Sequence, residues 1–141
     1  MSVSARAVTS ATDNQVCPER LVVEHITSRW GMLVLTALLD RSYRFSELRR
    51  EIGGVSEKML AQTLQTLERD GFVHRNARPV IPPHVDYTVT DMGREAGERM
   101  RAMIQWVDDR MSAVVDARAA YDRVRAERDA ATEAPPVART R

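Results

Sequence analysis

The stretch GGVSEKMLAQTLQTLERDG, Gly53 to Gly71, carries the signals of a single helix with a defined start and a defined end. Gly53 and Gly54 interrupt whatever precedes them, and Ser56 can cap the unpaired amides of a first helical turn. At the other end, Gly71 can adopt the left-handed conformation that terminates a helix. The stretch therefore predicts one helix between the glycine pair and Gly71.

The two faces of this helix differ in chemistry. Leucine recurs at the spacing of one helical stripe, which must face a core, at Leu60, Leu64 and Leu67. At about 100° per residue, the opposite face carries amides, hydroxyls and basic groups: Lys58, Gln62, Gln65 and Arg69, flanked by Met59, Thr63 and Thr66. Ordinary solvated faces hold Glu–Lys pairs four residues apart, whereas here the acidic residues stay at the ends. Side chains of this kind can read base edges or hold phosphates in a major groove; a merely polar exterior is the alternative.

Three segments upstream complete a helical motif. CPERLVVEHITSRW, residues 17–30, suggests a short helix with Pro18 in the first turn, where its missing amide costs nothing. WGMLVLTALLD, residues 30–40, is apolar almost all round and predicts a buried central helix. RFSELRREI, residues 44–52, has apolar residues on one side and arginines on the other. A short helix, a glycine-bearing turn and a second helix with a polar outer face form the helix-turn-helix pattern.

After Gly71 the pattern changes to a period of two. FVHR, residues 72–75, and VDYTVT, residues 85–90, each alternate in the manner of half-buried strands. NARPVIPPH, residues 76–84, lies between them and holds three prolines, which favour a stiff extended loop over a central strand. The segment therefore predicts a projecting hairpin, or wing, over residues 75–85. The predicted fold class is mainly α with a small β-hairpin wing, a winged helix-turn-helix.

A long helix is expected from Thr90, which can cap it, with Asp91 at the positive end of the helix dipole. Apolar side chains step along this helix at spacings of three and four: Ala96, Met100, Met103, Val107, Met111 and Val114. No further domain is left to cover this stripe, so a second copy of the same helix is the expected cover. We therefore predict a homodimer that associates through its N- and C-terminal helices, with an interface that includes Met100, Met103, Val107 and Met111.

The chain divides into three predicted parts. Residues 1–16 are small and polar without periodicity and predict a flexible arm. Residues 17–115 form the winged helix-turn-helix and dimerisation domain, since 141 residues suit one compact domain rather than two. Residues 116–141 predict a charged helical extension, which ends at the Pro135–Pro136 pair, followed by a disordered tail.

Composition limits the classes of function. No apolar run approaches a membrane span and the N-terminus lacks the apolar core of a signal peptide, which predicts a cytoplasmic protein without a membrane partner. The single cysteine, Cys17, rules out a disulfide within one chain. Net charge is only +1, but residues 41–84 hold eight arginine or lysine residues against five acidic ones. That local basic excess surrounds the Gly53–Gly71 helix and suits attraction to nucleic acid.

Catalysis is not expected. The three histidines, His25, His74 and His84, have no acid or nucleophile at a recognisable catalytic spacing. No glycine-rich phosphate loop and no metal-ligand cluster appears, so neither a cofactor nor a metal is predicted. A winged helix that contacts protein or RNA is the alternative to DNA binding, because the fold serves other partners as well. The polar outer face of the Gly53–Gly71 helix favours DNA.

The combination of motifs resembles the HxlR family of bacterial winged-helix transcription regulators, which are MarR-like, over residues 17–106. The matching segments are CP at 17–18, RW at 29–30, RFSELRR at 44–50, SEKMLAQTLQTLERDGFVHR at 56–75, IPPHVDYTVT at 81–90, and Gly93. The resemblance implies a homodimeric regulator, expected to be a repressor, on a palindromic double-stranded DNA operator. It also implies that helix 56–70 enters the major groove and that the wing lies on the backbone or in the minor groove.

The resemblance further implies which residues face DNA. On the helix these are Ser56, Lys58, Met59, Gln62 and Thr63; Arg44 and Arg49 would face phosphates; and the wing adds Arg75, Arg78 and His84. Relatives often carry Arg or Lys where this wing has His84, and an aromatic residue where it has Arg78. The basic contact of the wing is therefore expected to have moved to Arg78, and His84 would bind phosphate well only when protonated. Relatives often have Arg in place of Thr63, so the base preference should differ.

Two features could receive a signal. Cys17 is either a small apolar residue at the start of the first helix or a thiol sensor. A helix N-terminus and Arg20 favour the thiolate, whereas Glu19 opposes it. Some members of the resembled family use a cysteine near this point as a sensor. Trp30, Trp106 and the methionines of the last helix could line a pocket for a small effector or be ordinary core, so an oxidant and a small molecule are both candidate effectors.

Overall fold

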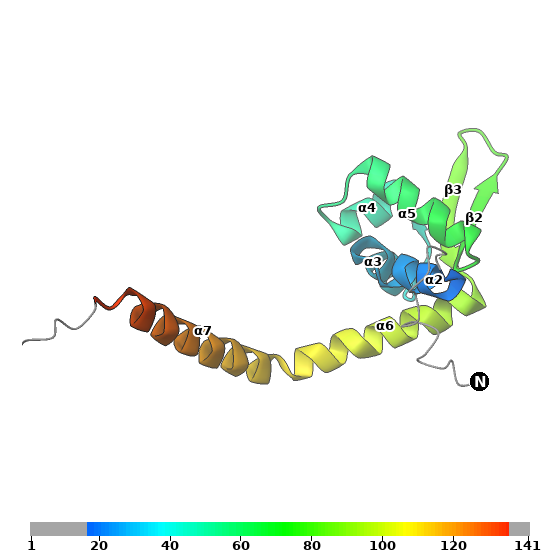
Figure 1. Cartoon of the computed structure of the whole chain (residues 1–141). Coiled ribbons are helices and arrows are strands. Elements are labelled where there is room, and N and C mark those ends of the chain that lie inside the picture. Colours follow the sequence, from blue (N-terminus) through cyan, green and yellow to red (C-terminus); the bar gives the residue numbers. More distant parts are fainter. Residues whose placement is uncertain (1–16, 136–141) are drawn as a thin grey trace, which may run out of the picture. The chain divides into compact units, whose positions relative to one another are not determined.

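The computed structural model describes residues 17–135 (Figure 1). The predicted flexible arm, residues 1–16, and the last part of the predicted tail, residues 136–141, lie outside the described residues. The elements follow in the order α2 Pro18–Thr27, α3 Arg29–Leu38, β1 Tyr43–Arg44, α4 Phe45–Ile52, α5 Glu57–Arg69, β2 Val73–Arg78, β3 His84–Val89, α6 Asp91–Asp109 and α7 Met111–Glu133. Most described residues are helical and the strands form one small antiparallel sheet, which confirms the predicted fold class.

The chain separates into two compact units. The first ends at Ala102 and holds α2 to α5, the sheet and the beginning of α6, whereas the second begins at Met103 and holds the end of α6 and all of α7.

No helix within residues 17–135 is both long enough and apolar enough to cross a lipid bilayer.

The core of the first unit forms where α3, α4 and α5 meet. Its most deeply buried side chains are Val34, Leu35, Leu38, Leu48, Leu60, Leu64 and Leu67. The leucine stripe predicted for α5 is thus confirmed, and each leucine stabilises the fold by about 1.5–3 kcal/mol through burial. α3 is buried on one side only, because its neighbours leave Trp30, Met32 and Leu33 half-buried. The predicted buried central helix thus supplies Val34, Leu35 and Leu38 to the core, while its other side is half-buried in the single chain.

Both ends of α5 form as predicted. The Ser56 hydroxyl accepts a hydrogen bond from the Met59 amide at 3.1 Å, which caps the first turn. Gly71 has φ +86°, and the amides of Phe72 and Gly71 donate to the carbonyls of Leu67 and Glu68 at 2.9 and 3.1 Å. This pair of hydrogen bonds is the Schellman motif, which requires a left-handed residue at the position of Gly71.

The sheet has the strand order β1-β3-β2, with β3 in the centre. β2 and β3 form the predicted hairpin, but β2 continues through Arg78, so the loop between the strands is shorter than the sequence suggested. The third strand was not predicted, because Tyr43–Arg44 is too short to show a period of two before α4 begins. Its pairing places Arg44 opposite Asp86 of β3, which brings the helix-turn-helix and the wing together.

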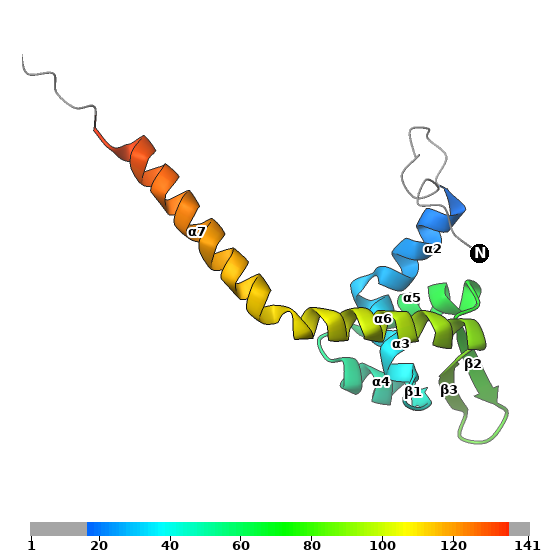
Figure 2. The same cartoon turned by 90° about the horizontal axis from the view of Figure 1, so that it is seen from below.

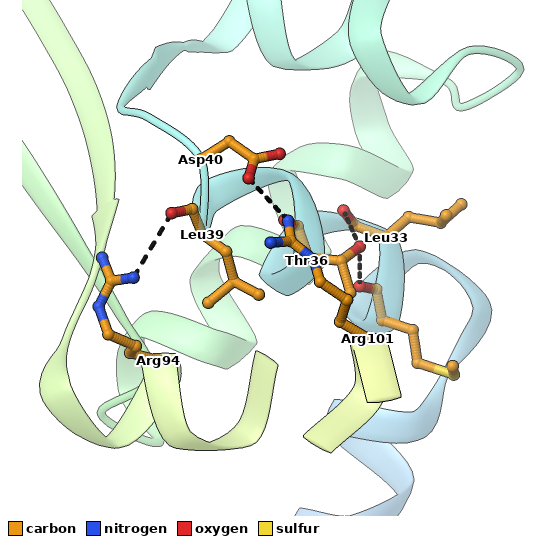
Figure 3. Close-up of polar contacts among 7 residues, drawn as sticks. Leu33, Thr36, Leu39, Asp40, Arg94 and Arg101 are labelled. Atoms are coloured by element: carbon orange, nitrogen blue, oxygen red, sulfur yellow. Dashed lines mark hydrogen bonds and ion pairs between the residues drawn. The ribbon is translucent and has the colours of Figure 1, made fainter. Parts of the chain in front are cut away.

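α6 lies against α3 at close range (Figure 2). A Cβ atom added at Gly97 would meet the Leu35 carbonyl at 3.0 Å, so a small residue allows the two helices to approach. Arg101 Nη2 donates to the Thr36 carbonyl at 3.0 Å and contacts Asp40 Oδ1 at 2.8 Å, while Arg94 Nη1 donates to the Leu39 carbonyl at 3.4 Å (Figure 3). Arg101 thus adds a donor to the Thr36 carbonyl, which also accepts from the Leu39 amide at 3.3 Å, and Arg94 supplies a donor to the Leu39 carbonyl just after α3.

α6 and α7 are separate helices, so the prediction of one continuous helix from Thr90 through Val114 is wrong. Arg110 leaves helical geometry with φ −105° and ψ 4°, and its amide donates to the Val107 carbonyl at 3.0 Å, a contact of the tighter 3₁₀ type. Asp108 and Asp109 lie at the end of α6 and just before α7, close to the positive end of the α7 dipole.

Candidate nucleic-acid interface

α5 presents a continuous polar face to solvent. Lys58, Met59 and Gln62 are exposed, and so are Gln65 and Arg69 further along the helix. Ser56, which caps the helix, is exposed too. The sequence therefore assigned the outward face correctly. Because the leucine stripe holds the other side of α5 in the core, this face has a fixed orientation in the first unit.

Two threonines on the flank of α5 have their hydroxyl protons already engaged. Thr63 Oγ1 donates to the Met59 carbonyl at 2.8 Å, and Thr66 Oγ1 donates to the Gln62 carbonyl at 3.0 Å. Each hydroxyl oxygen can still accept a hydrogen bond, and each methyl group can contact an apolar group. A base that faces Thr63 would therefore be recognised through an amino group or a thymine methyl.

The turn before α5 is basic and held by an arginine. Gly53 and Gly54 have φ of +69° and +72°, conformations that favour glycine. Arg49 Nε donates to the Val55 carbonyl at 3.1 Å and its Nη1 lies 3.3 Å from Glu57 Oε1, so Arg49 stabilises the turn while remaining exposed.

A groove of about 500 Å³ lies beside this turn and the first turn of α5, lined by Arg49, Arg50, Gly54, Val55 and Ser56. Two guanidinium groups beside the positive end of a helix dipole suit a phosphate group. Arg50 was not among the predicted DNA-facing residues, although the adjacent pair Arg49-Arg50 was a signal for it.

The wing carries the remaining predicted basic residues. Arg75 and Arg78 are exposed on β2, whereas His84 is half-buried at the start of β3. His84 Nδ1 lies 2.5 Å from Arg44 Nη2, and His84 Nε2 lies 3.5 Å from Asp86 Oδ2. The structure therefore brings Arg44 and His84 together, although they are 40 residues apart in the chain. His84 contacts protein groups on both ring nitrogens, which the sequence did not predict.

A second unpredicted contact joins α2 to the end of α5. His25 Nδ1 lies 2.5 Å from Asp70 Oδ2, and both side chains are largely buried. Beside this contact, a groove of about 340 Å³ runs between α2 and the outer face of α5; it is lined by Glu24, His25, Ser28, Met59, Gln62, Thr63 and Thr66. His25 and Asp70 lie 45 positions apart in the chain, so no local sequence pattern could reveal their contact.

Cys17 stands immediately before α2, where its thiol donates to Glu19 Oε2 at 2.8 Å. This hydrogen bond lowers the pKa of the Glu19 carboxyl below its ordinary value. The nearby Arg20 pairs with Glu24 at 3.4 Å.

The predicted dimer residues differ in exposure. Met100 is 7% exposed and belongs to the core of the first unit, so a partner chain could contact little of it. Met103 is 57% exposed and Val107 is 43% exposed, and Met111 is also exposed. The apolar stripe is thus already covered within the chain up to Met100, and only its part from Met103 onward is available to a partner.

Within residues 17–135 no three His, Cys, Asp or Glu side chains lie together in a way that could hold a metal ion.

Comparison with known proteins gives consistent similarities. Residues 25–114 match the HxlR-like helix-turn-helix family. The uncharacterized HTH-type transcriptional regulator YtfH of Escherichia coli (strain K12) is 54% identical over 107 residues, which cover 74% of this chain and 85% of that protein.

Two solved structures extend the comparison. The putative transcriptional regulator ytfH from Salmonella typhimurium has a TM-score of 0.67 and 51% identity, covering 72% of this chain and 91% of that one. The redox regulator HypR in its oxidized form has a TM-score of 0.60 and 31% identity, covering 66% of this chain and 96% of that one.

Proposed function

The chain belongs to the HxlR-like helix-turn-helix family of DNA-binding transcriptional regulators, and we propose that it represses transcription as a homodimer on a two-fold symmetric operator. The observation that carries the proposal is the exposed polar face of α5 beside the basic turn that Arg49 and Arg50 line. The matching relatives are named as HTH-type transcriptional regulators. Repression by occupancy needs only a surface that binds the operator.

In the proposed complex, α5 lies in the major groove. Lys58, Met59, Gln62 and Thr63 face base edges, because they stand on the exposed face of the helix and its flank. The first turn receives a phosphate between Ser56 and Arg49, and the wing places Arg75 and Arg78 on the backbone. Such backbone contacts set the register of the protein on DNA, whereas the α5 contacts select the sequence.

The proposed dimer interface starts at Met103. Large apolar side chains there are exposed in the single chain, at Met103, Ile104, Trp106, Val107 and Met111. Exposed apolar residues in such number are typical of a surface that a partner covers. A two-fold dimer would present two α5 helices to half-sites about one helical turn apart on DNA.

Lys58 offers a direct test, because it is the only lysine of the chain. Amine-specific reagents modify Lys58 and the N-terminal amine, and the N-terminal amine serves as the internal control. An operator selected from random duplex DNA should protect Lys58 from modification, and Lys58→Ala should weaken binding by about 1–3 kcal/mol. Equal reactivity of Lys58 with and without the operator would exclude α5 from the groove.

The same measurements separate the alternative partners. A winged helix that contacts RNA would bind structured RNA at least as well as the selected duplex in a filter-binding comparison. A preference for duplex DNA that depends on sequence supports the operator model. Lys58→Ala should relax the preference at one base pair if Lys58 reads a base, and weaken all sequences alike if it contacts a phosphate.

Oxidation is the second candidate, as the signal that releases the operator. It is supported by similarity to HypR, which is described as a redox regulator, and by the place of Cys17 before α2. Because Cys17 is the only cysteine of the chain, a disulfide must join two chains or recruit a small thiol. A bridge between two chains requires Cα atoms within about 7 Å and would change the spacing of the two α5 helices.

Diamide treatment tests this candidate. Operator affinity of the wild type should fall, non-reducing electrophoresis should show a crosslinked dimer or a mixed disulfide, and Cys17→Ser should keep its affinity. Equal loss in wild type and Cys17→Ser, or loss in neither, would make Cys17 a structural residue.

A further inference from the structure

We propose that His84 is a neutral positioning residue that holds Arg44 for its phosphate contact, and does not itself bind DNA as a cation; this rests on the proposed operator binding. The contact between Arg44 Nη2 and His84 Nδ1 carries the inference. An arginine side chain has donors and no acceptor, so the nitrogen of His84 that faces it must accept. Nδ1 is therefore unprotonated, and a neutral imidazole keeps its proton on Nε2.

The other ring nitrogen fits this tautomer. His84 Nε2 lies 3.5 Å from Asp86 Oδ2, and both side chains are largely buried, with 25% and 17% of their surface exposed. A carboxylate near Nε2–H favours the proton there and leaves Nδ1 as the acceptor. The nearby Asp86 thus favours the Nε2–H tautomer, and His84 in turn orients Arg44.

Sheet geometry places these groups on one face. Arg44 and Asp86 are register partners between β1 and β3, and Arg78 and His84 are register partners between β2 and β3. Residues opposite one another, and residues two apart on one strand, point to the same side of a sheet. Arg44, His84, Asp86 and Arg78 therefore share the polar face, opposite the face on which Tyr43 enters the core.

The charged groups around His84 determine what a second proton would do. Arg44 faces it from β1, Arg78 from β2 and Asp86 from β3. Glu47 of α4 lies near Arg44 as well: Arg41 is the main cause that lowers the Glu47 pKa, and Arg44 adds to it. An imidazolium carries N–H groups on both nitrogens, so it would present a donor and a positive charge to Arg44. Protonation would therefore break the contact and release Arg44 from its position.

The location of Arg44 explains why its orientation matters for a phosphate contact. It is the residue before α4, the first helix of the helix-turn-helix, and its side chain reaches across to the wing. A long exposed arginine loses rotamer freedom when it binds a phosphate, and a contact that already orders it lowers that cost. A lysine or arginine in place of His84 would contact the backbone directly, whereas His84 acts through Arg44.

Four variants test the proposal on a selected operator: Arg44→Ala, His84→Ala, His84→Asn and the double variant Arg44→Ala/His84→Ala. Arg44→Ala should weaken binding by about tenfold, as the loss of one phosphate contact does. His84→Ala should weaken binding in the wild-type background and add nothing in the Arg44→Ala background. His84→Asn should recover most of that loss, because the asparagine oxygen can take the place of Nδ1 as acceptor.

The pH dependence of operator binding distinguishes the two possible roles of His84. A neutral positioning residue and a phosphate-binding imidazolium predict opposite changes in affinity as pH falls. In acid, operator binding by the wild type should weaken relative to His84→Asn, because a protonated imidazole has no acceptor for Arg44. A phosphate contact made by the imidazolium would instead strengthen as pH falls, and His84→Ala would then reduce the salt slope of binding by about one. Additive losses in the double variant, or tighter binding in acid that depends on His84, would overturn the proposal.

The outcomes distinguish this proposal from the proposed function. If Lys58→Ala weakens operator binding but Arg44→Ala does not, the operator model stands and the role of His84 is overturned. If no duplex DNA binds, the operator model fails and with it the positioning role. The network itself can be measured without DNA by ¹⁵N NMR of the three histidines: His84 should be the Nε2–H tautomer, and the opposite tautomer overturns the proposal.

Discussion

Individual arginine residues of this protein have different structural roles, which their charge alone does not reveal. Arg49 holds the turn before α5 through the Val55 carbonyl, and Arg101 donates to the Thr36 carbonyl near the end of α3. Arg44 contacts His84, and Arg41 pairs with Glu47 at 2.6 Å. The sequence showed a basic excess over residues 41–84, and the structure shows that part of it is committed to the fold.

The Arg41–Glu47 pair predicts a stability difference that depends on pH. The hydrogen bond from Arg41 lowers the pKa of Glu47 below its ordinary value of 4.5. A carboxyl whose pKa is lower in the folded state stabilises the protein above its unfolded pKa, and the effect is lost as pH falls through the folded pKa. Glu47→Gln should therefore be less stable than the wild type at pH 6, and the two should converge below pH 4.5.

Urea unfolding between about pH 3 and pH 7 measures this difference in stability, because that pH range spans the ordinary titration of a glutamate. The difference should be small, because both partners are accessible to solvent. Glu51→Gln is the matched control, since it removes a carboxylate from the same helix without touching the Arg41 contact. A Glu47→Gln variant that stays less stable than the wild type in acid would point to packing rather than to charge.

At the scale of elements, the position of α6 depends on glycines that let it approach the rest of the first unit. A Cβ atom added at Gly93 would stand 1.9 Å from the Phe72 carbonyl oxygen, in the segment that joins α5 to the wing. At Gly97 the corresponding distance, to the Leu35 carbonyl, is 3.0 Å. Thr90 strengthens the same junction, since its hydroxyl donates to the Gly71 carbonyl at 2.6 Å and accepts from the Gly93 amide at 3.0 Å.

Substitution of these glycines should therefore destabilise to different degrees. Alanine has a higher helix propensity than glycine by about 1 kcal/mol, so without a clash either change would stabilise α6. Gly93→Ala forces the backbone of α6 away from Phe72 and should cost about 2–3 kcal/mol, whereas Gly97→Ala needs a shift of a few tenths of an ångström and should cost less. Thermal or urea unfolding gives the order, and a Gly93→Ala variant as stable as the wild type would disprove the close approach.

For the whole molecule, the main expectation is assembly through α6 and not through the distal part of α7. The family matches residues 25–114, and α7 continues to Glu133. Val107 and Val124 are similarly exposed in the single chain, at 43% and 47%, but only Val107 lies within the matched range. Val107 and Val124 are therefore a matched pair of positions at which the same substitution, valine to glutamate, can be compared.

Val107→Glu should give a monomer and weaken operator binding, because a charge buried in an apolar interface has a large desolvation cost. Val124→Glu should leave the dimer intact. Sedimentation equilibrium at micromolar concentration measures both. A wild type that is monomeric there would refute the proposed homodimer, and dissociation by Val124→Glu alone would move the interface to α7.

Local chemistry determined much of this protein. The cap at Ser56, the end of α5 at Gly71 and the stripe of Leu60, Leu64 and Leu67 all depend on residues within a few positions of one another, and all were predictable. The outward face of α5 followed from the same periodicity, because a helix with one side in the core has the other in solvent. Family membership depends on a longer range, since the family matches residues 25–114.

Tertiary structure alone decided the contacts that join distant segments. The contacts of Arg44 with His84 and of His25 with Asp70 span 40 and 45 residues, and β1 is a strand only because β3 lies beside it. Burial of Met100 likewise depends on the surface that α6 finds in the first unit. Periodicity shows which side of an element is apolar, but not which surface covers it, because the partner is selected by packing in three dimensions.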